Sequence, residues 1–569
     1  MANFYTDHPE IQFNVESSPL MEKIVALKEH DFADKDNFDY APENYADAMD
    51  SYNRVCEIAG EITANTIFPN SEAVDAEGPH CENGRVRYAS KTYENLEATR
   101  KAGLNGVTMP RRYGGLNFPV TVYTAINEMI ASADAGFENI WSLQDCIETL
   151  YEFGNDDQRS RYIPRVCAGE TMSMDLTEPD AGSDLQRVML KATYSEEDKC
   201  WYLNGVKRFI TNGDSDIHLV LARSEEGTHD ARGLSMFIYD KRDGGVTVRR
   251  IENKMGIHGS PTCELVYKNA KAELCGSRKR GLIKYVMALM NGARLGIAAQ
   301  SVGISQTSYD EALAYAKNRK QFGTEIVNFP AVYEMLSTMK AKLDAGRALL
   351  YETARYVDIY KGLEDIERER PLTPEEKQEL KKFDKLATAL TPLAKGMNAE
   401  FANQNSYDCI QVHGGSGYML EYASQRLYRD ARITSIYEGT TQLQTVAALP
   451  HLSTGEYSAI IAELEAQPVA PEFEALAVRA KAMSVKFNEV LESVKATGDK
   501  ELLDLACRHL YELAAYCIMT QLLLRDATKN AVLFAKSLKV FVNYAEAEVA
   551  KHYNFVKSVD VAAIENYKK

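Results

Sequence analysis

The sequence predicts a mainly helical α+β protein in which a small central β domain is flanked by helical domains. Three observations lead to this prediction. At 569 residues the chain is longer than one hydrophobic core usually supports, so two to four domains are expected. Apolar residues at helical spacing dominate both ends of the chain. Between them, after Glu178, the sequence becomes a series of short segments rich in β-forming residues.

The composition is that of an ordinary folded protein, with 45% hydrophobic and 26% charged residues. The formal net charge of −17 argues against nucleic acid as the main partner, because phosphate binding needs a basic surface. Ten cysteines occur without a CxxC pair, so we expect most of them to be reduced and buried. No metal site is predicted.

The first residues, Met1 to His8, lack the basic region and apolar run of a secretory signal and are too acidic for a mitochondrial presequence. No stretch approaches the roughly 18 consecutive apolar residues of a membrane span, so no transmembrane segment is expected. These features favour a cytoplasmic protein, most simply a bacterial one.

The amino-terminal part is expected to be an arm or short helix, residues 1–45, followed by a helical domain, residues 46–172. Within this domain the segment 93–100 is expected to be helical, and Gly103 and Gly106, which follow it, are expected to end the helix. Two further segments have apolar residues at helical spacing: 121–131 and 145–153.

The central β domain is predicted for residues 173–279, as a small barrel or sandwich. Its expected strands are 189–194, 201–203, 206–210, 217–222, 234–239, 246–251 and 262–267. Asn204-Gly205 separates two of these segments, and this dipeptide is the strongest short-range signal for a hairpin. We therefore expect a tight turn at this position.

The remaining chain is expected to be helical. A C-terminal helical bundle is predicted for residues 280–450, with long helices at 293–318 and 330–360. The highly charged segment within 361–383 contains two prolines and is interpreted as an insertion between helices. The last divisions are a linker, 451–471, and an extra helical domain, 472–569.

Two motifs lie in the β region. The segment 177–184, Thr-Glu-Pro-Asp-Ala-Gly-Ser-Asp, is a turn by its composition, but its amides and hydroxyls could also bind a polar heterocycle. In the segment 207–213, Phe209 and Thr211 lie two residues apart on a strand and so share a face. They could stack on and hydrogen-bond one flat ligand, or simply pack in the core.

Two more motifs lie in the helical region. The segment 319–323, Arg-Lys-Gln-Phe-Gly, ends a helix, where its cations could complement the helix dipole or clamp a pyrophosphate. The segment 411–418, Gln-Val-His-Gly-Gly-Ser-Gly-Tyr, has glycines that allow a ligand to approach the backbone closely. It lacks the GxGxxG spacing of a dinucleotide fingerprint and follows no strand, and His413 is expected to be a packed histidine.

The fifth motif contains Glu438 between Ile-Tyr and Gly-Thr, within the segment 429–442. This is not the setting of a solvated surface acid. A carboxylate in an apolar pocket has a raised pKa, which suits a base that removes a weakly acidic C–H proton.

Together and in this order, the five motifs closely resemble the acyl-CoA dehydrogenase family over roughly residues 50 to 450. The resemblance implies an N-terminal helical domain, a middle β domain and a C-terminal four-helix bundle. The phrase 254–263 and the C-terminal extension are similar to a longer bacterial branch that includes methylmercaptopropionyl-CoA dehydrogenases.

The resemblance implies FAD as the cofactor. Many family members have Trp where this chain has Phe209, and the segment Asn328-Phe329-Pro330 departs from the His-Gln of shorter members. Arg319 would bind the FAD diphosphate, in the family from the neighbouring subunit. The implied cofactor-binding residues are Met174, Leu176, Thr177, Ser183, Phe209, Thr211, Arg319, Phe322, Gln411, Gly414, Gly415, Thr440 and Gln442.

The resemblance also implies an acyl-CoA substrate, bound near Ser183, Asn291, Arg294 and Gly439. Glu438 would remove the α proton while the β hydrogen leaves as hydride to the flavin, giving a trans-2-enoyl-CoA. Some relatives carry this glutamate one residue before the arginine, but here that position is Ala293. The implied electron acceptor is an electron-transfer flavoprotein.

Two other functions remain open at this stage. An acyl-CoA oxidase would share every motif and pass electrons to oxygen, and a DNA-binding flavoprotein of the same fold would need a basic C-terminal surface. The apolar faces of the last hundred residues must be buried against something. We expect them to cover the surface through which shorter members form tetramers, which predicts a homodimer. These apolar positions are Leu502, Leu503, Leu505, Ala506, Leu510, Leu513, Cys517, Ile518, Ala531, Val532, Phe534, Leu538, Val540 and Phe541.

Overall fold

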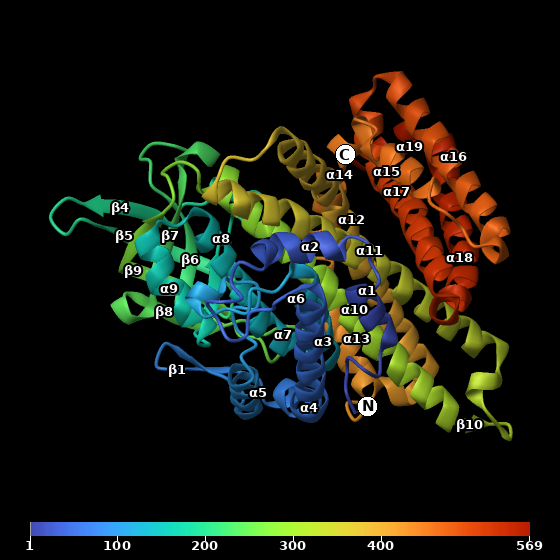
Figure 1. The fold of residues 1–569 in the computed structure, drawn as a ribbon, viewed down its shortest axis with the longest axis horizontal. Coiled ribbons are helices and arrows are strands. Elements are labelled where there is room, and N and C mark those ends of the chain that lie inside the picture. Colours follow the sequence, from blue (N-terminus) through green and yellow to red (C-terminus); the bar gives the residue numbers. More distant parts are fainter. Residues whose placement is uncertain (1, 569) are drawn as a thin grey trace. The chain divides into compact units, whose positions relative to one another are not determined.

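The computed structural model describes residues 2–568 (Figure 1). The chain forms two compact units, with the division between Gly303 and Ile304. The first unit contains helices and a central sheet, and the second is almost entirely helical. The α+β, mainly helical class expected from the sequence is confirmed. The finer domain boundaries stay a prediction.

The helical part of the first unit begins with the expected N-terminal arm, in which Phe4, Ile11 and Met21 are buried. Its helices are α1 (Pro9–Glu16), α2 (Met21–Lys28), α3 (Tyr45–Ile62), α4 (Phe68–Glu77), α5 (Ser90–Lys101), α6 (Val120–Ala133), α7 (Ala135–Trp141), α8 (Cys146–Phe153) and α9 (Asp156–Cys167). Helix α5 ends where expected, two residues before Gly103, whose φ is 68°. The hairpin of β1 (His80–Glu82) and β2 (Arg85–Arg87) was not predicted.

The central sheet consists of β3 (Met172–Asp175), β4 (Lys191–Ser195), β5 (Cys200–Thr211), β6 (Ile217–Arg223), β7 (Leu234–Asp240), β8 (Val246–Ile251) and β9 (Thr262–Cys275). Strands β4, β5, β9, β7 and β6 pair in a closed circuit, in which β4 and β6 share one residue pair, Lys191 and Arg223. Strand β3 extends β6 in parallel and β8 adds to β9.

Strands β6 and β7 are buried on both faces, which explains their nearly continuous apolar sequences. Alternate residues of β6 belong to different cores because successive side chains point to opposite faces. Leu219 and Leu221 pack in one cluster with Leu150 of α8 and Val166 of α9. Val220 and its alternate neighbours pack in a second cluster formed by the strands.

The hairpin expected at Asn204-Gly205 is wrong, because β5 continues through this dipeptide. Asn204 instead forms a bulge opposite β9, and its side-chain oxygen accepts a hydrogen bond of 2.8 Å from the amide of Asn269. A Cβ at Gly205 would lie 3.1 Å from Leu190 Cα, so close approach of the chain favours glycine here. The turn between β4 and β5 lies at residues 196–199, with Lys199 at φ 51°.

The second unit is built on a pair of long helices, α11 (Pro330–Glu369) and α12 (Pro374–His413), which pack along each other. The expected insertion at 361–383 is wrong as a separate element, because it consists of the adjoining ends of these two helices. Thr373 begins α12 with a capping box: Glu376 N donates to its hydroxyl, and its own amide donates to the Glu376 carboxylate. Helix α10 (Met287–Asn318) crosses the division between the units.

The other elements of the second unit are β10 (Lys320–Gln321), β11 (Thr324–Glu325), α13 (Ala423–Thr434), α14 (Thr441–Ser453), α15 (Glu456–Glu465), α16 (Glu474–Thr497), α17 (Lys500–Lys529), α18 (Ala531–Ser558) and α19 (Val561–Glu565). The segment 451–471, expected to be a linker, contains helix α15. Tyr457, Ile460, Ile461 and Leu464 are buried at helical spacing, and α15 packs on α17.

The C-terminal helices α16, α17 and α18 lie side by side (Figure 1). Helix α17 is the central element, because residues 510–524 are buried on every side by α11, α14, α15, α16 and α18. The prediction that the extension buries apolar faces is confirmed for most positions, including Leu510, Leu538 and Phe541. Val532 is an exception, with 94% of its surface exposed.

The cysteines agree with the expectation from composition, since all ten are free and eight are buried. Among residues 2–568, the helical segment Gly281–Asn318 is long and apolar enough to cross a membrane by length and composition alone. Buried Gln300 in this segment donates to the carboxylate of Glu138 at 2.6 Å, so protein contacts surround part of it. The absence of a transmembrane segment stays a prediction.

A buried ion-pair group joins the C-terminal extension to α11. Glu352 accepts from Arg355 at 3.0 Å on its own helix and from Arg525 of α17 at 2.9 Å. Burial alone would raise the pKa of Glu352, but the two guanidinium groups outweigh it and lower the pKa to about 2. Because this folded-state pKa is below the ordinary value of 4.5, the stabilisation is present above about pH 4.5.

We expect Glu352→Gln to lower the free energy of unfolding by about 3 kcal/mol at pH 7, because two buried arginines lose the carboxylate that they share, and only Arg525 keeps another, Asp526. The difference from wild type should shrink as the pH falls from about 4.5 towards 2, where the wild-type carboxylate also becomes neutral. Urea unfolding followed by circular dichroism at pH 7 and pH 3 measures both effects. Glu492→Gln, which breaks an exposed pair with Lys495, is the control and should cost less than about 1 kcal/mol.

Candidate functional site

The segment 177–184 is held in place by a buried ion pair. The ammonium of Lys207 on β5, which is fully buried, donates to the Glu178 carboxylate at 2.9 Å and to the Leu176 carbonyl at 2.8 Å. The same carboxylate accepts the amides of Met189 and Leu190 at 2.7 and 2.9 Å. Burial lowers the pKa of Lys207, while Glu178 opposes that shift. The turn is therefore fixed by Glu178, while Asp180, Ser183 and Asp184 are exposed.

The second motif adjoins the first, because Arg208 N donates to the Thr177 carbonyl at 2.9 Å. Phe209 has φ 59° within a register shift of β5, and half of its surface is exposed. Ile210 is buried in the strand core, whereas Thr211 is partly exposed. The backbones of the first two motifs are thus joined by a hydrogen bond, and Phe209 and Thr211 are both at least partly exposed.

The other predicted residues of the first unit lie on three elements. Met174 is partly buried on β3, Leu176 is buried just after it, and Ser183 is exposed. Next to Met174, Asp175 is fully buried and accepts from His218 at 2.8 Å and from the Tyr267 hydroxyl, which anchors the strand. On α10, Arg294 and Asn291 lie one turn apart, and the Arg294 guanidinium donates to Asn291 Oδ1 at 3.4 Å.

In the second unit, Arg319 follows directly after α10 and begins a two-stranded hairpin of β10 and β11. Phe322 and Gly323 form its tip with φ 51° and 85°, as a tight primed turn requires. Arg319 is exposed and Phe322 has 98% of its surface exposed.

The segment 411–418 begins at the end of α12, where Gly414 has φ 61°. No atom lies within 4 Å of a Cβ built at Gly414 or Gly415, so the backbone here is open. His413 is buried, lies 2.7 Å from the Cys409 carbonyl through Nδ1 and stacks on Tyr315 at 4.3 Å. It is therefore a packed histidine, as expected.

Tyr315 connects the third and fourth motifs. Its ring stacks on His413, its hydroxyl donates to Ser416 at 3.3 Å, and its carbonyl accepts the amide of Arg319 at 2.8 Å. One small core with Ala312, Ala316 and Val412 lies beneath both segments. The exposed arginine and the open glycines are consequently carried by one rigid support.

Glu438 lies in the loop between α13 and α14, and it has a left-handed backbone, with φ 54° followed by 89° at Gly439. This conformation is uncommon for a residue other than glycine. Two side chains hold the loop carbonyls: Lys395 donates to Gly439 O at 2.6 Å, and Gln444 donates to Gly439 O at 2.9 Å and to Glu438 O at 3.3 Å. Both side chains are fully buried.

The residues after Glu438 begin helix α14. Thr440 is the N-cap, and its hydroxyl accepts the amide of Leu443 at 3.2 Å. Gln442 is exposed on the first turn. Neither Lys395 nor Gln444 was predicted from the sequence, and the one available signal for Lys395 was a lysine within an otherwise apolar helical run.

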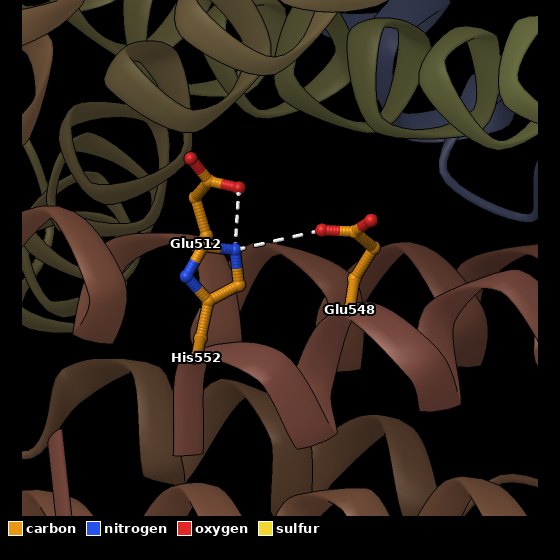
Figure 2. Close-up of side chains that lie close together, drawn as sticks. All are labelled: Glu512, Glu548 and His552. Atoms are coloured by element: carbon orange, nitrogen blue, oxygen red, sulfur yellow. Dashed lines mark ion pairs between the residues drawn. The ribbon is translucent and has the colours of Figure 1, made fainter. Parts of the chain in front are cut away.

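One group of side chains among the described residues has the spacing to hold a metal ion: Glu512 of α17 with Glu548 and His552 of α18 (Figure 2). His552 Nε2 lies 2.9 Å from Glu512 and 3.7 Å from Glu548. Arg508 donates to Glu512 at 2.5 Å and Lys551 pairs with Glu548. Because each carboxylate already has a cation, we interpret the group as ion pairs between two helices.

The groups described above suit a flavin dinucleotide in their chemistry. An exposed aromatic ring beside a hydroxyl can face a flat heterocycle, as at Phe209 and Thr211. A guanidinium can pair with a diphosphate, and open glycine backbone admits close approach of a nucleotide. The donor set is therefore compatible with FAD.

Comparisons with known proteins agree with this chemistry. Models of the acyl-CoA dehydrogenase N-terminal, middle and C-terminal domains match residues 56–170, 173–270 and 280–448. A further model, described as acyl-CoA dehydrogenase C terminal, matches residues 453–564. The family models thus cover most of the chain, including the C-terminal extension.

Curated relatives are similar at about one third identity. The 3-methylmercaptopropionyl-CoA dehydrogenase of Ruegeria pomeroyi is 33% identical over 70% of this chain and 69% of its own length. The 3-(aryl)acrylate reductase of Clostridium sporogenes is 34% identical over 70% of this chain and 97% of its own.

Solved structures show the same fold. Butyryl-CoA dehydrogenase of Megasphaera elsdenii has a TM-score of 0.60 at 28% identity and covers 70% of this chain and 97% of its own. A chain from work on the electron transferring flavoprotein of Acidaminococcus fermentans has a TM-score of 0.61 at 28% identity, with the same coverage. An acyl-CoA dehydrogenase of Bacillus anthracis has a TM-score of 0.74 at 23% identity and covers 89% of this chain and 88% of its own.

These matches include all five sequence motifs, at 177–184, 207–213, 319–323, 411–418 and 429–442. The chain is therefore an oxidoreductase that acts on acyl-CoA. It belongs to the acyl-CoA dehydrogenase family.

Proposed function

We propose that the protein catalyses the FAD-dependent α,β-dehydrogenation of an acyl-CoA thioester to a trans-2-enoyl-CoA, with Glu438 as the base. The observation that carries this proposal is the loop at Glu438, whose left-handed backbone is fixed through two carbonyls by buried donors. Such fixation suits a carboxylate that must meet one particular C–H bond, because misplacement by about 1 Å can cost 100-fold in rate.

The chain's own residues have three tasks in the proposed reaction. Glu438 accepts the proton from the carbon next to the thioester carbonyl. The amide of Glu438 can donate to the thioester oxygen, where negative charge develops, and a fixed donor of this kind contributes about 3 to 4 kcal/mol. Ser183, Asn291, Arg294 and Gly439 are proposed to bind and orient the acyl-CoA.

The cofactor contacts follow from the family resemblance. The bound FAD supplies the hydride acceptor for the hydrogen on the β carbon. Phe209 and Thr211 would lie beside its ring system, and Arg319 would pair with its diphosphate. The remaining proposed FAD contacts are Met174, Leu176, Thr177, Ser183, Phe322, Gln411, Gly414, Gly415, Thr440 and Gln442.

The proposed electron acceptor is an electron-transfer flavoprotein. One similar chain comes from work on the electron transferring flavoprotein of Acidaminococcus fermentans, which supports this choice. An acyl-CoA oxidase would differ by forming hydrogen peroxide as fast as it turns over in air. Two relatives are named as reductases, 3-(aryl)acrylate reductase and acryloyl-CoA reductase (NADH). The test should therefore also measure whether the protein reduces an enoyl-CoA.

We also propose a cytoplasmic homodimer. Support for the dimer comes from the exposed hairpin at Arg319 and Phe322, which presents a phenyl ring and a guanidinium to solvent. Support also comes from helices α17 and α18, which pack on α11 of the same chain and so cover an apolar surface.

The base assignment is tested with Glu438→Gln. The variant should keep its yellow FAD but lose anaerobic bleaching of the flavin by a panel of acyl-CoAs, since an amide cannot accept the proton. Glu421→Gln, at an exposed glutamate before α13, should bleach like wild type. If Glu438→Gln is bleached at the wild-type rate, another group is the base.

The role of Arg319 is tested by the affinity for FAD. Arg319→Ala should weaken FAD binding by about 100-fold or more, because the diphosphate loses a charged, forked donor. Lys320→Ala is a matched control, because its ammonium pairs with Glu325 at 3.3 Å within the hairpin. Equal FAD occupancy of both variants after dialysis would mean that Arg319 does not bind the diphosphate and only complements the helix dipole at the end of α10.

The proposed assembly is tested by light scattering on the FAD-loaded protein. The expected mass is that of two chains of 63.6 kDa. A mass near four chains would mean that the extension leaves the second interface open. A monomer that retains FAD would contradict the contribution of Arg319 from a neighbouring subunit.

A further inference from the structure

The loop at Glu438 needs support from the rest of the fold. A left-handed backbone at a residue other than glycine costs on the order of 1 kcal/mol or more and persists only where its surroundings fix it. Here the fixing groups are the side chains of Lys395 and Gln444, which both donate to the carbonyl of Gly439. Lys395 is therefore one of the two groups that fix the position of the loop.

Lys395 lies on an unusual turn of α12. Pro392, three residues earlier, is inside the helix, where proline cannot donate a backbone hydrogen bond. Gly396 follows Lys395, and a Cβ at this position would collide with the hydroxyl of Tyr511 and approach Gln444 Cβ to 3.5 Å. The turn that carries Lys395 is thus shaped to receive a side chain from another helix.

That side chain comes from α17 of the C-terminal extension. The Tyr511 hydroxyl donates to the carbonyl of Pro392 at 2.8 Å, and Tyr511 is fully buried. One turn earlier, the Cys507 thiol donates to the carbonyl of Thr445 at 3.2 Å, in the helix that follows the Glu438 loop. Residues four apart share one face of a helix, so a single face of α17 contacts the supports on both sides of the loop.

A third contact joins α17 to the same loop. Thr441, three residues after Glu438, donates its hydroxyl to Glu400 at 2.8 Å, and Arg508 lies 3.8 Å from that carboxylate. Arg508 also donates to Glu512 at 2.5 Å. Glu512 in turn pairs with His552 of α18, so this part of α17 is itself fixed to its neighbour (Figure 2).

The neighbouring cations keep Glu512 charged although it is mostly buried. Burial alone would raise the pKa of Glu512, but His552 and Arg508 outweigh it and lower the pKa to about 2. Glu512 is therefore charged near neutral pH. The ion pair between Glu512 and Arg508 consequently persists near neutral pH.

We propose that Tyr511 of the C-terminal extension is a positioning residue for the reaction, acting through the α12 turn that carries Lys395 on the Glu438 loop. This inference rests on the proposed role of Glu438. In this proposal the extension buries apolar surface and also helps to position the Glu438 loop. Lys395 is the second positioning residue, because its ammonium holds the loop directly.

Tyr511→Phe and Lys395→Met test the proposal in the full, FAD-loaded chain. We expect the rate of anaerobic flavin bleaching to fall about tenfold in Tyr511→Phe and about 100-fold in Lys395→Met, because the carboxylate loses its alignment. Hydrogen exchange of the peptide amides from 436 to 444 should become faster in both variants. The exchange rate measures how firmly the loop is held, and the measurement does not depend on catalysis.

Tyr457→Phe is the matched control. The Tyr457 hydroxyl is also fully buried and donates at 2.8 Å to a carbonyl of α12, that of Ala389, from helix α15. It lies outside the turn of Lys395. Tyr457→Phe should lose as much thermal stability as Tyr511→Phe while it keeps the wild-type bleaching rate and the wild-type exchange at 436–444.

The outcomes separate the two proposals. Wild-type bleaching and exchange in Tyr511→Phe would overturn the positioning role, even if Lys395→Met does not fold. Equal rate losses in Tyr511→Phe and Tyr457→Phe would also overturn it, because the effect would then be one of stability alone. If no acyl-CoA bleaches the wild-type protein, the proposed function fails, while the exchange of the loop still decides whether Tyr511 supports it.

Discussion

The left-handed turn at Glu438 and Gly439 imposes the main constraint on the second unit, and the buried ammonium of Lys395 is the interaction that satisfies it. A charged group is costly to bury, so its environment has to supply acceptors. The carbonyl of Gly439, in the loop that takes this unusual conformation, is one of these acceptors. The strained loop and the buried charge therefore stabilise each other.

The first unit uses the same device at a different loop. Lys207 is also fully buried, and it holds the Leu176 carbonyl and the Glu178 carboxylate beside the segment 177–184. In both units a lysine on a regular element fixes the backbone of an irregular one. Loops fixed in this way can keep exposed polar groups at defined positions, which a binding site for a large cofactor requires.

The C-terminal extension changes what the helical unit can do. Helix α17 is buried on all sides, so it is part of the core of the unit, although it lies after the segment that carries the sequence motifs. Helix α17 contacts both helices that hold the Glu438 loop, α12 through Tyr511 and α14 through Cys507. Arg525 of α17 also pairs with Glu352 of α11. An addition to the fold has thereby become one of its supports.

The sequence alone determined the order of helical and β regions, the family and the motifs, because apolar periodicity and short motifs are local properties of the chain. Tertiary contacts decided the rest. Asn204-Gly205 became a bulge because the Asn204 side chain bonds the facing strand, and the segment around α15 became a helix because α17 covers its apolar face. Lys395 and Tyr511 are far apart in sequence, and only the packing of α17 on α12 shows that they act on one loop.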